Sequence, residues 1–378
     1  MILLLAACTG PPPASDGVDS APVDSGDTYV NDFVPPAWVP DFVHSAEAPE
    51  ASEGGVVIVP LIQSGGGGIV ALGARGDVVW AFPETAEGLI RPPLRARLSA
   101  DGKDILYNHM AANADALCEI VRVPLDGGTP STVGMHGGHT DFVEYTPGGY
   151  ATLGWEIRAF DDRKIMGDTI VELSPEGVER TVWSVFDDFA PDLSQTYAPL
   201  YPEDPTIEDW SHINGISYDA DEDAYYVTMT FNNGVAKVDR ATGTMEWFFG
   251  DPDAGDFSNP DADKLLELPH SVERIDGGVL AFSRGRVGVP GECSEAVELT
   301  IDQDAREVRR AWNYTSPDCI SVTYLGGAER LPGGNTLITW TTAGQIDQIT
   351  PDGRRAWTVN TAIGNGIGFT TWVPELPR

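Results

Sequence analysis

The residues with the clearest chemical potential lie in one short segment, residues 210–214. His212 and Asn214 are two positions apart, just before an alternating run at 224–229. In an extended chain, side chains two apart point to the same side. His212 and Asn214 are therefore expected to face one site together, as a base or nucleophile beside a polar amide.

Two more histidines lie at comparable places in the chain. His139 precedes a turn at 146–149, His212 precedes a turn at 218–221, and His270 precedes a turn at 274–277. A single histidine is usually a structural residue. Three histidines at matched places in neighbouring repeats instead favour one shared site.

These turns belong to a strand unit that repeats from about residue 54 onward. Its later strands can be read at 168–183, 234–247 and 345–357. About six units with a period on the order of 50 residues are typical of propeller blades. Gly-rich turns between strands indicate hairpins, and radial closure leaves few sheet edges exposed. The sequence predicts an all-β fold, a six-bladed β-propeller over residues 54–378. Two tandem β-sandwiches are the alternative, but they would not require one unit throughout.

Composition agrees with a large β-protein and limits its partners. The chain has 378 residues, 42% of them hydrophobic, with 42 Gly, 29 Pro and 10 Trp. Its net charge of −35 repels nucleic acid and anionic lipid. The simplest meaning of this charge is solubility, including in a salty habitat. An anionic substrate would need a local positive pocket.

The N-terminal segment predicts export. Residues 1–8 form a short apolar stretch, and Leu5-Ala6-Ala7-Cys8 matches the bacterial lipobox, whose cysteine is lipidated. No basic region precedes it, which a wrongly assigned start codon would explain; the alternative is a chance apolar start. Residues 9–53 are a lead-in, rich in Pro, Asp and Ser, that we expect to be a disordered tether as far as about Asp27. The protein is then a membrane-anchored lipoprotein on the periplasmic or cell-surface side.

The other cysteines fit an oxidising compartment. Cys293 and Cys319 flank a predicted hairpin at 295–314, and they are the pair nearest in sequence. We expect them to form a disulfide and Cys118 to remain a buried thiol. No spacing of His and Cys suggests a metal site.

Several segments resemble one known family. The motif at 210–214 and the hairpin after it resemble the W-x-H-x-N region of bacterial aryl-sulfate sulfotransferases. Residues 138–142, 269–271 and 278–286 resemble other segments of that family, as do 295–299 and 332–338. The resemblance covers nearly everything after the tether. The chain is similar to a short, lipoprotein-like member that lacks the N-terminal β-domain of the longer enzymes.

The resemblance implies a reaction without a nucleotide cofactor. A channel histidine takes a sulfuryl group from an aryl sulfate and passes it to a phenol. By position His270 would be the nucleophile, while His212, Asn214 and His139 would hold the sulfuryl oxygens and assist the leaving phenol. Neutral imidazole is available near pH 7, and a sulfo-histidine divides the transfer into two displacements.

The chain departs from the family at one charged position. The family's Arg after the W-x-H-x-N motif falls at Thr230, so Thr230→Arg is expected to leave activity unchanged or raise it. Arg284 and Arg286 are candidates to bind the substrate instead, or they are surface residues in a turn.

Two other functions remain open. One is a non-catalytic, surface-anchored propeller that binds a small ligand or partner, which the loss of the Arg favours. The other is a calcium-dependent lactonase-like hydrolase, with the acidic run at 219–223 as calcium ligand. That run is better explained as a solvated turn. Three channel histidines favour the transferase.

Overall fold

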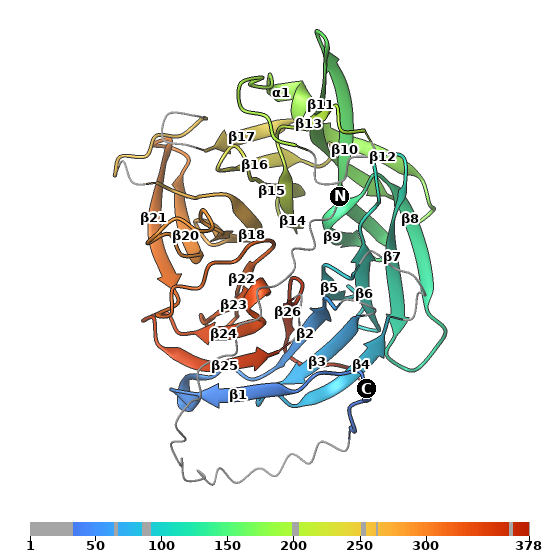
Figure 1. Ribbon diagram of the computed structural model, residues 1–378, viewed down its shortest axis with the longest axis vertical. Helices are drawn as coiled ribbons and strands as arrows, with labels where there is room; N and C mark the ends of the chain where they lie inside the picture. The colour runs from blue at the N-terminus through green and yellow to red at the C-terminus, as the bar shows by residue number, and fades with distance from the viewer. Residues whose placement is uncertain are drawn as a thin grey trace.

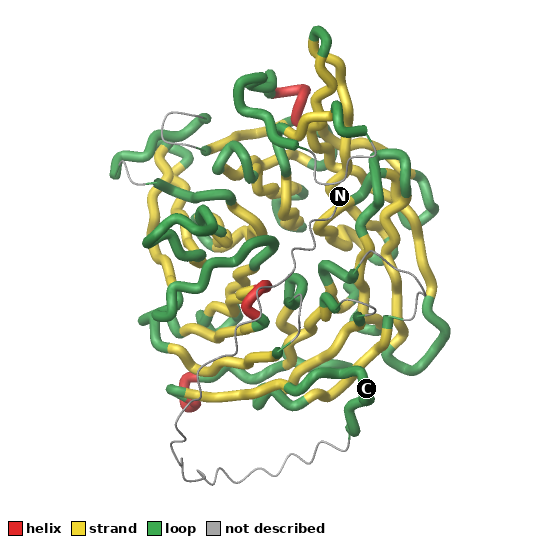
Figure 2. Tube along the Cα trace, in the orientation of Figure 1, coloured by secondary structure: helices red, strands yellow, loops and turns green. Residues whose placement is uncertain are grey.

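The computed structural model describes residues 33–63, 67–84, 92–198, 204–250, 255–261, 264–362 and 366–377. Within these ranges nearly all of the regular secondary structure is β-strand, arranged as six sheets around a central axis (Figure 1). The predicted six-bladed β-propeller is confirmed. Figure 2 shows the small amount of helix, which consists of α1 (Val185–Asp188) and the 3-10 turns η1 (Pro49–Ala51) and η2 (Thr341–Ala343).

Each blade is an antiparallel sheet whose first strand lies nearest the axis. The first three blades, from the axis outward, are β26 (Thr371–Val373), β2 (Val56–Leu61), β3 (Gly68–Gly73) and β4 (Val78–Pro83); β5 (Ala96–Leu98), β6 (Asp104–His109), β7 (Leu117–Pro124) and β8 (Ser131–His136); and β9 (His139–Thr146), β10 (Gly149–Phe160), β11 (Arg163–Leu173) and β12 (Glu179–Ser184). The last three are β14 (Ile213–Asp219), β15 (Ala224–Met229), β16 (Gly234–Asp239) and β17 (Met245–Phe249); β18 (Pro269–Ile275), β19 (Gly278–Ser283), β20 (Glu295–Asp302) and β21 (Glu307–Thr315); and β22 (Gly327–Arg330), β23 (Thr336–Trp340), β24 (Gln345–Ile349) and β25 (Arg355–Thr361). The short β13 (Ile207–Asp209) pairs in parallel with β11.

Two strands from opposite ends of the chain close the ring. β26 pairs with β2 at the axis, and β1 (Phe42–Ala46) pairs with β25 at the outer edge of the last blade. β1 precedes residue 54, where the repeat suggested that the propeller begins. It extends the edge of a finished blade rather than starting a new unit, so the repeat does not reveal it. Cys8 and the tether to Asp27 lie outside the described residues.

Tight hairpins join the first and second strands of several blades. Gly148 and Gly277 occupy these turns with φ of 74° and 75°, a left-handed conformation that glycine adopts without steric cost. These turns fix the register of each innermost strand against the second strand of its blade.

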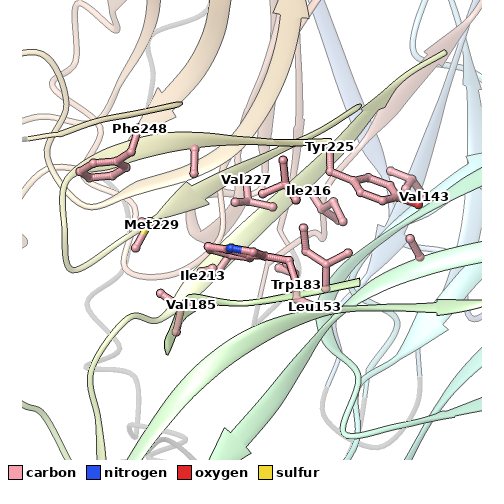
Figure 3. Packing of buried hydrophobic residues seen from close by; sticks show 14 of the residues in the cluster. Val143, Leu153, Trp183, Val185, Ile213, Ile216, Tyr225, Val227, Met229 and Phe248 are labelled. Carbon is pink, nitrogen blue, oxygen red and sulfur yellow. The ribbon is translucent and has the colours of Figure 1, made fainter. Parts of the chain in front are cut away.

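The core lies between blades, where neighbouring sheets pack face to face. Figure 3 shows the contact between the third and fourth blades, in which Trp183 and Leu153 pack near Ile213 and Val227. All four side chains are almost fully buried. Each contributes about 1.5–3 kcal/mol relative to exposure. This packing fixes β14 against β9 and so holds the start of β14 in place.

A bulge interrupts the innermost strand of the same three blades that carry the candidate histidines. The bulges lie between His139 and Phe142 in β9, between Ile213 and Gly215 in β14, and between His270 and Val272 in β18. A bulge re-aims the side chains beside it and is common next to binding sites. Thr140, His212 and Leu268, at or next to these bulges, have left-handed φ of 52°, 50° and 49°.

Candidate active site

The three candidate histidines and Asn214 lie at or next to the starts of three neighbouring innermost strands. His139 and His270 belong to β9 and β18, whereas His212 directly precedes β14. Ile213 and Pro269 each pair with the last residue of the adjacent strand, so the register counterpart of His270 is Asn214. The histidines therefore match by blade but not residue by residue.

His270 has one defined tautomer and a neutral ring. Its Nδ1 lies 3.1 Å from the Leu268 carbonyl oxygen, which can only accept a hydrogen bond, so the proton is on Nδ1. Its Nε2 lies 3.2 Å from the Asn214 amide nitrogen, which donates to it. Burial and the positive charges of Arg284 and His212 lower the pKa of His270 to about 3, although the Leu268 contact opposes them. At physiological pH Nε2 therefore stays unprotonated, and its lone pair accepts from Asn214 until a substrate displaces that contact.

Asn214 is held by a threonine. The Asn214 amide donates to Thr230 Oγ1 at 2.8 Å, and Thr230 Oγ1 donates to the Pro269 carbonyl at 2.7 Å. Thr230, the position of the family's Arg, is 1% exposed. Its hydroxyl thus fixes the amide that faces His270.

His212 has the opposite electrostatic character from His270. Its Nδ1 lies 2.5 Å from Asp209 Oδ2, and its ring stacks on Phe231 with centroids 4.7 Å apart. Burial and Arg284 lower the pKa of His212, but the carboxylates of Asp209 and Asp168 outweigh them and raise it above the ordinary value of 6.5. His212 therefore holds a proton more readily than a free histidine.

His139 connects to this group through a buried carboxylate. Its Nε2 lies 2.9 Å from Asp168 Oδ1, in an arrangement not aligned as a hydrogen bond, and its ring stacks on Trp155 at 4.7 Å. Asp168 also accepts from Ser211 Oγ and, at 3.0 Å, from the Ile213 backbone amide. With Nδ1 3.0 Å from Thr140 Oγ1, both nitrogens of His139 contact protein groups. His139 is placed to support the start of β14.

Arg284 supplies positive charge next to the two central histidines. Its Nη1 donates to the Thr323 carbonyl at 2.7 Å, while its buried Nε has no partner. Within the described ranges no carboxylate pairs with it. Its positive charge lowers the pKa of both His270 and His212. Arg284 is free to hold an anion.

Arg286 is placed differently. Its guanidinium is exposed and forms an ion pair with Glu292, which raises its pKa. The structure thus brings Arg284, but not Arg286, to the histidines.

A disulfide lies close to Arg284 in the chain. Cys293 and Cys319 are bonded, with Cα atoms 5.0 Å apart, and Cys118 is a buried thiol. Ser294, next to Cys293, donates to the Arg284 carbonyl and accepts from the Val322 amide at 2.8 Å. Ser294 therefore contacts the Arg284 backbone and also binds Val322, the residue before Thr323, whose carbonyl accepts from the Arg284 side chain.

The described residues also bear on metal binding and on membrane spans. No group of three or more His, Cys, Asp or Glu side chains in the described residues is arranged to hold a metal ion. In the acidic run, Asp219 Oδ1 accepts the amides of Asp221 and Glu222, each at 2.9 Å, as a solvated turn does. None of the helices in the described part of the chain is long and apolar enough to span a bilayer.

Sequence reasoning missed the two carboxylates that set the histidine charges. Asp209 stands three residues before His212, and this spacing was a visible signal. Asp168 comes from β11 of the preceding blade, and no local pattern marks it. Together the groups place a neutral imidazole, an imidazole with a raised pKa, an amide donor and a guanidinium in neighbouring blades, a set that could bind an anionic group.

Comparison with known proteins supports this arrangement over part of the chain. Residues 134–279 match the arylsulfotransferase (ASST) family model, a range that includes His139, His212 and His270. The match confirms the resemblance within residues 134–279 and supports a sulfotransferase-like function; the similar segments after residue 279, with Arg284, lie outside the matched range. No curated protein matches the chain.

The chain is also similar, at low identity, to several solved structures. A chain of the nidogen/laminin complex is 12% identical, with a TM-score of 0.53 over 84% of this chain and 97% of that one. A protein of unknown function from Bacteroides caccae is 11% identical, with a TM-score of 0.48 over 85% and 99%. The streptogramin B lyase structure is 15% identical, with a TM-score of 0.44 over 90% and 100%. At this level the nidogen/laminin likeness supports the propeller fold alone.

Proposed function

We propose that the protein transfers the sulfuryl group of an aryl sulfate to a phenolic acceptor through a sulfo-histidine at His270. One observation carries the proposal: His270 keeps its proton on Nδ1, against the Leu268 carbonyl, and presents the Nε2 lone pair beside Arg284. A nucleophile needs such a lone pair, and a transferred anion needs the adjacent positive charge.

The first half-reaction is a displacement at sulfur. His270 Nε2 attacks the sulfur and forms an N–S bond, while the bond between sulfur and the aryl oxygen breaks with its electron pair on that oxygen. His212 gives its proton to the departing phenolate. The products are a neutral phenol, neutral His212 and sulfo-His270.

The second half-reaction reverses these roles. Neutral His212 takes the proton of the acceptor phenol, whose oxygen attacks the sulfur, and the N–S bond returns its electrons to His270. Arg284 balances the charge of the sulfuryl oxygens without the family's Arg. The Asn214 N–H that contacts Nε2 in the free protein turns to a sulfuryl oxygen once Nε2 has bonded to sulfur. His139 is a positioning residue that acts through Asp168.

The test uses 4-nitrophenyl sulfate as donor and phenol as acceptor. Wild type should release 4-nitrophenol and gain the mass of one sulfuryl group on the peptide that contains His270. His270→Ala should lower turnover on the order of 10³-fold or more and abolish that mass gain. The control is His136→Ala, because His136 is exposed on β8.

Other outcomes would change the assignment. If wild type binds the aryl sulfate but neither releases phenol nor gains mass, the protein is a binding module. Full turnover in His270→Ala would show that His270 is not the nucleophile, and His212 would become the next candidate.

The same proposal places the enzyme outside the cytoplasm, anchored through a lipid on Cys8. The lipobox at residues 5–8 motivates it. Cys8→Ala should move the protein from the membrane fraction to the soluble exported fraction. An unchanged distribution would contradict the anchor.

A further inference from the structure

The other end of the channel contains a separate charged cavity. It has a volume of about 370 Å³ and is lined by later residues of the innermost strands, among them Arg97, Glu273, Glu329 and Thr371. Along β18 and β22, Ser271 contacts Ala328 and Glu273 contacts Arg330, with the same offset. These neighbouring strands therefore run in one direction, as expected for strands that ring the axis in Figure 1. His270 lies at the start of β18 and Glu273 lies further along it.

One ion pair in this cavity is already complete. Arg95 Nε and Nη2 each donate to an Asp141 oxygen at 2.8 Å, and the Arg95 guanidinium lies 4.2 Å from the Phe369 ring centroid. Both side chains are buried. This pair supports the channel wall and leaves the ligand-binding capacity to the groups beside it.

In each of two carboxylates next to this ion pair, only one oxygen accepts a hydrogen bond. Glu273 Oε2 accepts from the Arg330 backbone amide at 2.7 Å, and Glu329 Oε2 accepts from the Trp372 backbone amide at 2.9 Å. The second oxygen of each makes no hydrogen bond within the described structure. Burial and the charge of Glu329 raise the pKa of Glu273 to about 8, and burial raises the pKa of Glu329 to about 7. Arg330 and Arg97 oppose the shift at Glu273, and Arg95 and Arg97 oppose it at Glu329, but burial outweighs them.

Arg97 adds a hydrogen-bond donor that has no partner. Its Nη2 lies 3.4 Å from Asp141, and its buried Nε has no partner. Its charge is therefore only loosely matched, and it can donate to an acceptor atom of a ligand. Arg95 cancels Asp141, and Glu144, which also lines the cavity, lies 3.7 Å from Arg122; the remaining charges are Arg97 and the two glutamates. When both glutamates are ionised, the cavity has one net negative charge.

We propose that this cavity binds a small organic molecule with a primary ammonium group, held between Glu273 and Glu329. Two ammonium N–H groups donate to the unused carboxylate oxygens. The third can reach a hydroxyl such as that of Thr371, which lines the cavity and donates its own proton to the Ala96 carbonyl at 2.8 Å. The net charge of −35 also concentrates cations at the protein surface.

An anionic ligand suits the cavity less well. It would have to approach two carboxylates and would be opposed by the field of the whole molecule. This end of the channel therefore prefers the opposite charge from the site at His270. The proposal goes beyond sulfuryl transfer and does not depend on it.

Binding should be linked to proton release. Each glutamate that is protonated in the free protein must ionise to accept the ammonium. The charged and titratable groups that face the pair are Arg95, Arg97, Asp141, Glu144, Tyr218 and Arg330. The arginines stay positive and Asp141 stays ionised, its burial being outweighed by Arg95 and Arg97, which lower its pKa. The glutamates are thus the groups that change charge, and affinity should rise about tenfold per pH unit for each proton released between pH 6 and 8.

The experiment is calorimetric titration of the full chain with n-butylammonium chloride. Measurement in two buffers of different ionisation enthalpy reports the protons released. We expect release of about one proton at pH 7.5 and tighter binding at pH 8 than at pH 6. Glu273→Gln and Glu329→Gln should each weaken binding at least about tenfold, because each removes a charge but keeps the acceptor for its backbone amide.

Controls separate this site from general charge effects. Glu176→Gln removes one negative charge from an exposed turn and should leave binding unchanged. Both cavity variants should keep the wild-type thermal transition within a few degrees. Binding without proton release, equal binding by all three variants, or binding of potassium or calcium ions but not of butylammonium would each overturn the proposal.

Discussion

His212 and His270 lie in neighbouring blades but have opposite electrostatic surroundings. Two carboxylates raise the pKa of His212, whereas burial and Arg284 lower the pKa of His270 to about 3. Titratable groups whose environments push their pKa values apart are the usual acid and base of an active site. Here the buried, neutral ring is suited to attack, and the carboxylate-paired ring is suited to carry the proton.

This contrast predicts the pH dependence of donor use. His212 must be protonated to assist the departing phenolate, and its raised pKa extends the protonated form to higher pH than in a free histidine. kcat/KM for the donor should therefore fall as pH rises through a value above 6.5. His270 stays neutral down to about pH 3, so it should add no loss above that pH. Phenyl sulfate, with the poorer leaving group, should show the steeper fall than 4-nitrophenyl sulfate.

Asp209→Asn gives the matching variant. It removes the carboxylate that raises the pKa of His212, so the fall in kcat/KM should move to lower pH. An unchanged profile would mean that His212 is not the acid.

Thr230 allows a second prediction at this scale. Its hydroxyl joins Asn214 to the Pro269 carbonyl, so Thr230→Val should lower kcat/KM about ten- to hundredfold by leaving the buried amide without its acceptor. Thr228→Val is the control, because Thr228 is equally buried but its hydroxyl has no partner. The measurement is kcat/KM of the two variants at a temperature at which thermal unfolding shows both to be fully folded.

The contacts of Thr230 also bear on the Thr230→Arg variant. From the sequence alone, this variant is expected to leave activity unchanged or raise it, because it restores a positive charge. A guanidinium at this 1% exposed position would instead displace Asn214 and overpack the strand. We now expect that variant to lose activity, and an active Thr230→Arg would show that the strand can open.

At the scale of elements, the strands could be predicted and the bulges could not. Alternation and Gly-rich turns identify the hairpins, and they place each histidine near the start of a blade. Register depends on pairing with the next strand, and one inserted residue changes which side chain faces inward. This is why Asn214, rather than His212, matches His270. The contribution of Asp168 could not be predicted either, because it depends on how two blades pack.

The segment cross-linked by Cys293 and Cys319 predicts a link between a disulfide and substrate binding. Cys293→Ser with Cys319→Ser should raise KM for the aryl sulfate, because Thr323 and Ser294 then hold Arg284 less firmly. The unfolding free energy should fall by about 3 kcal/mol for a loop of this length. Arg284→Ala in the cross-linked protein should raise KM at least as much without that loss of stability. If the serine variant binds donor normally, the loop is held by its other contacts.

At the scale of the whole molecule, the propeller was predictable because one unit recurs from blade to blade. Ring closure by β1 and β26 was not, since each strand pairs with a segment roughly 300 residues away in sequence. The surface charge was visible from composition alone. Its effect on the two ends of the channel depends on where the fold places Arg284, Glu273 and Glu329.

The net charge of −35 predicts how salt affects reaction with an anionic donor. At low ionic strength the molecule repels an aryl sulfate before it reaches Arg284, and at about 0.1 M salt the repulsion is screened beyond about 10 Å. The contact with Arg284 is partly buried and is screened less. kcat/KM for 4-nitrophenyl sulfate should therefore rise between 10 and 200 mM salt, values chosen to span the screening range. The rate with varied neutral phenol should change little, and butylammonium binding at Glu273 should weaken. A donor rate that falls with salt would show that the local field of Arg284 outweighs the charge of the whole protein.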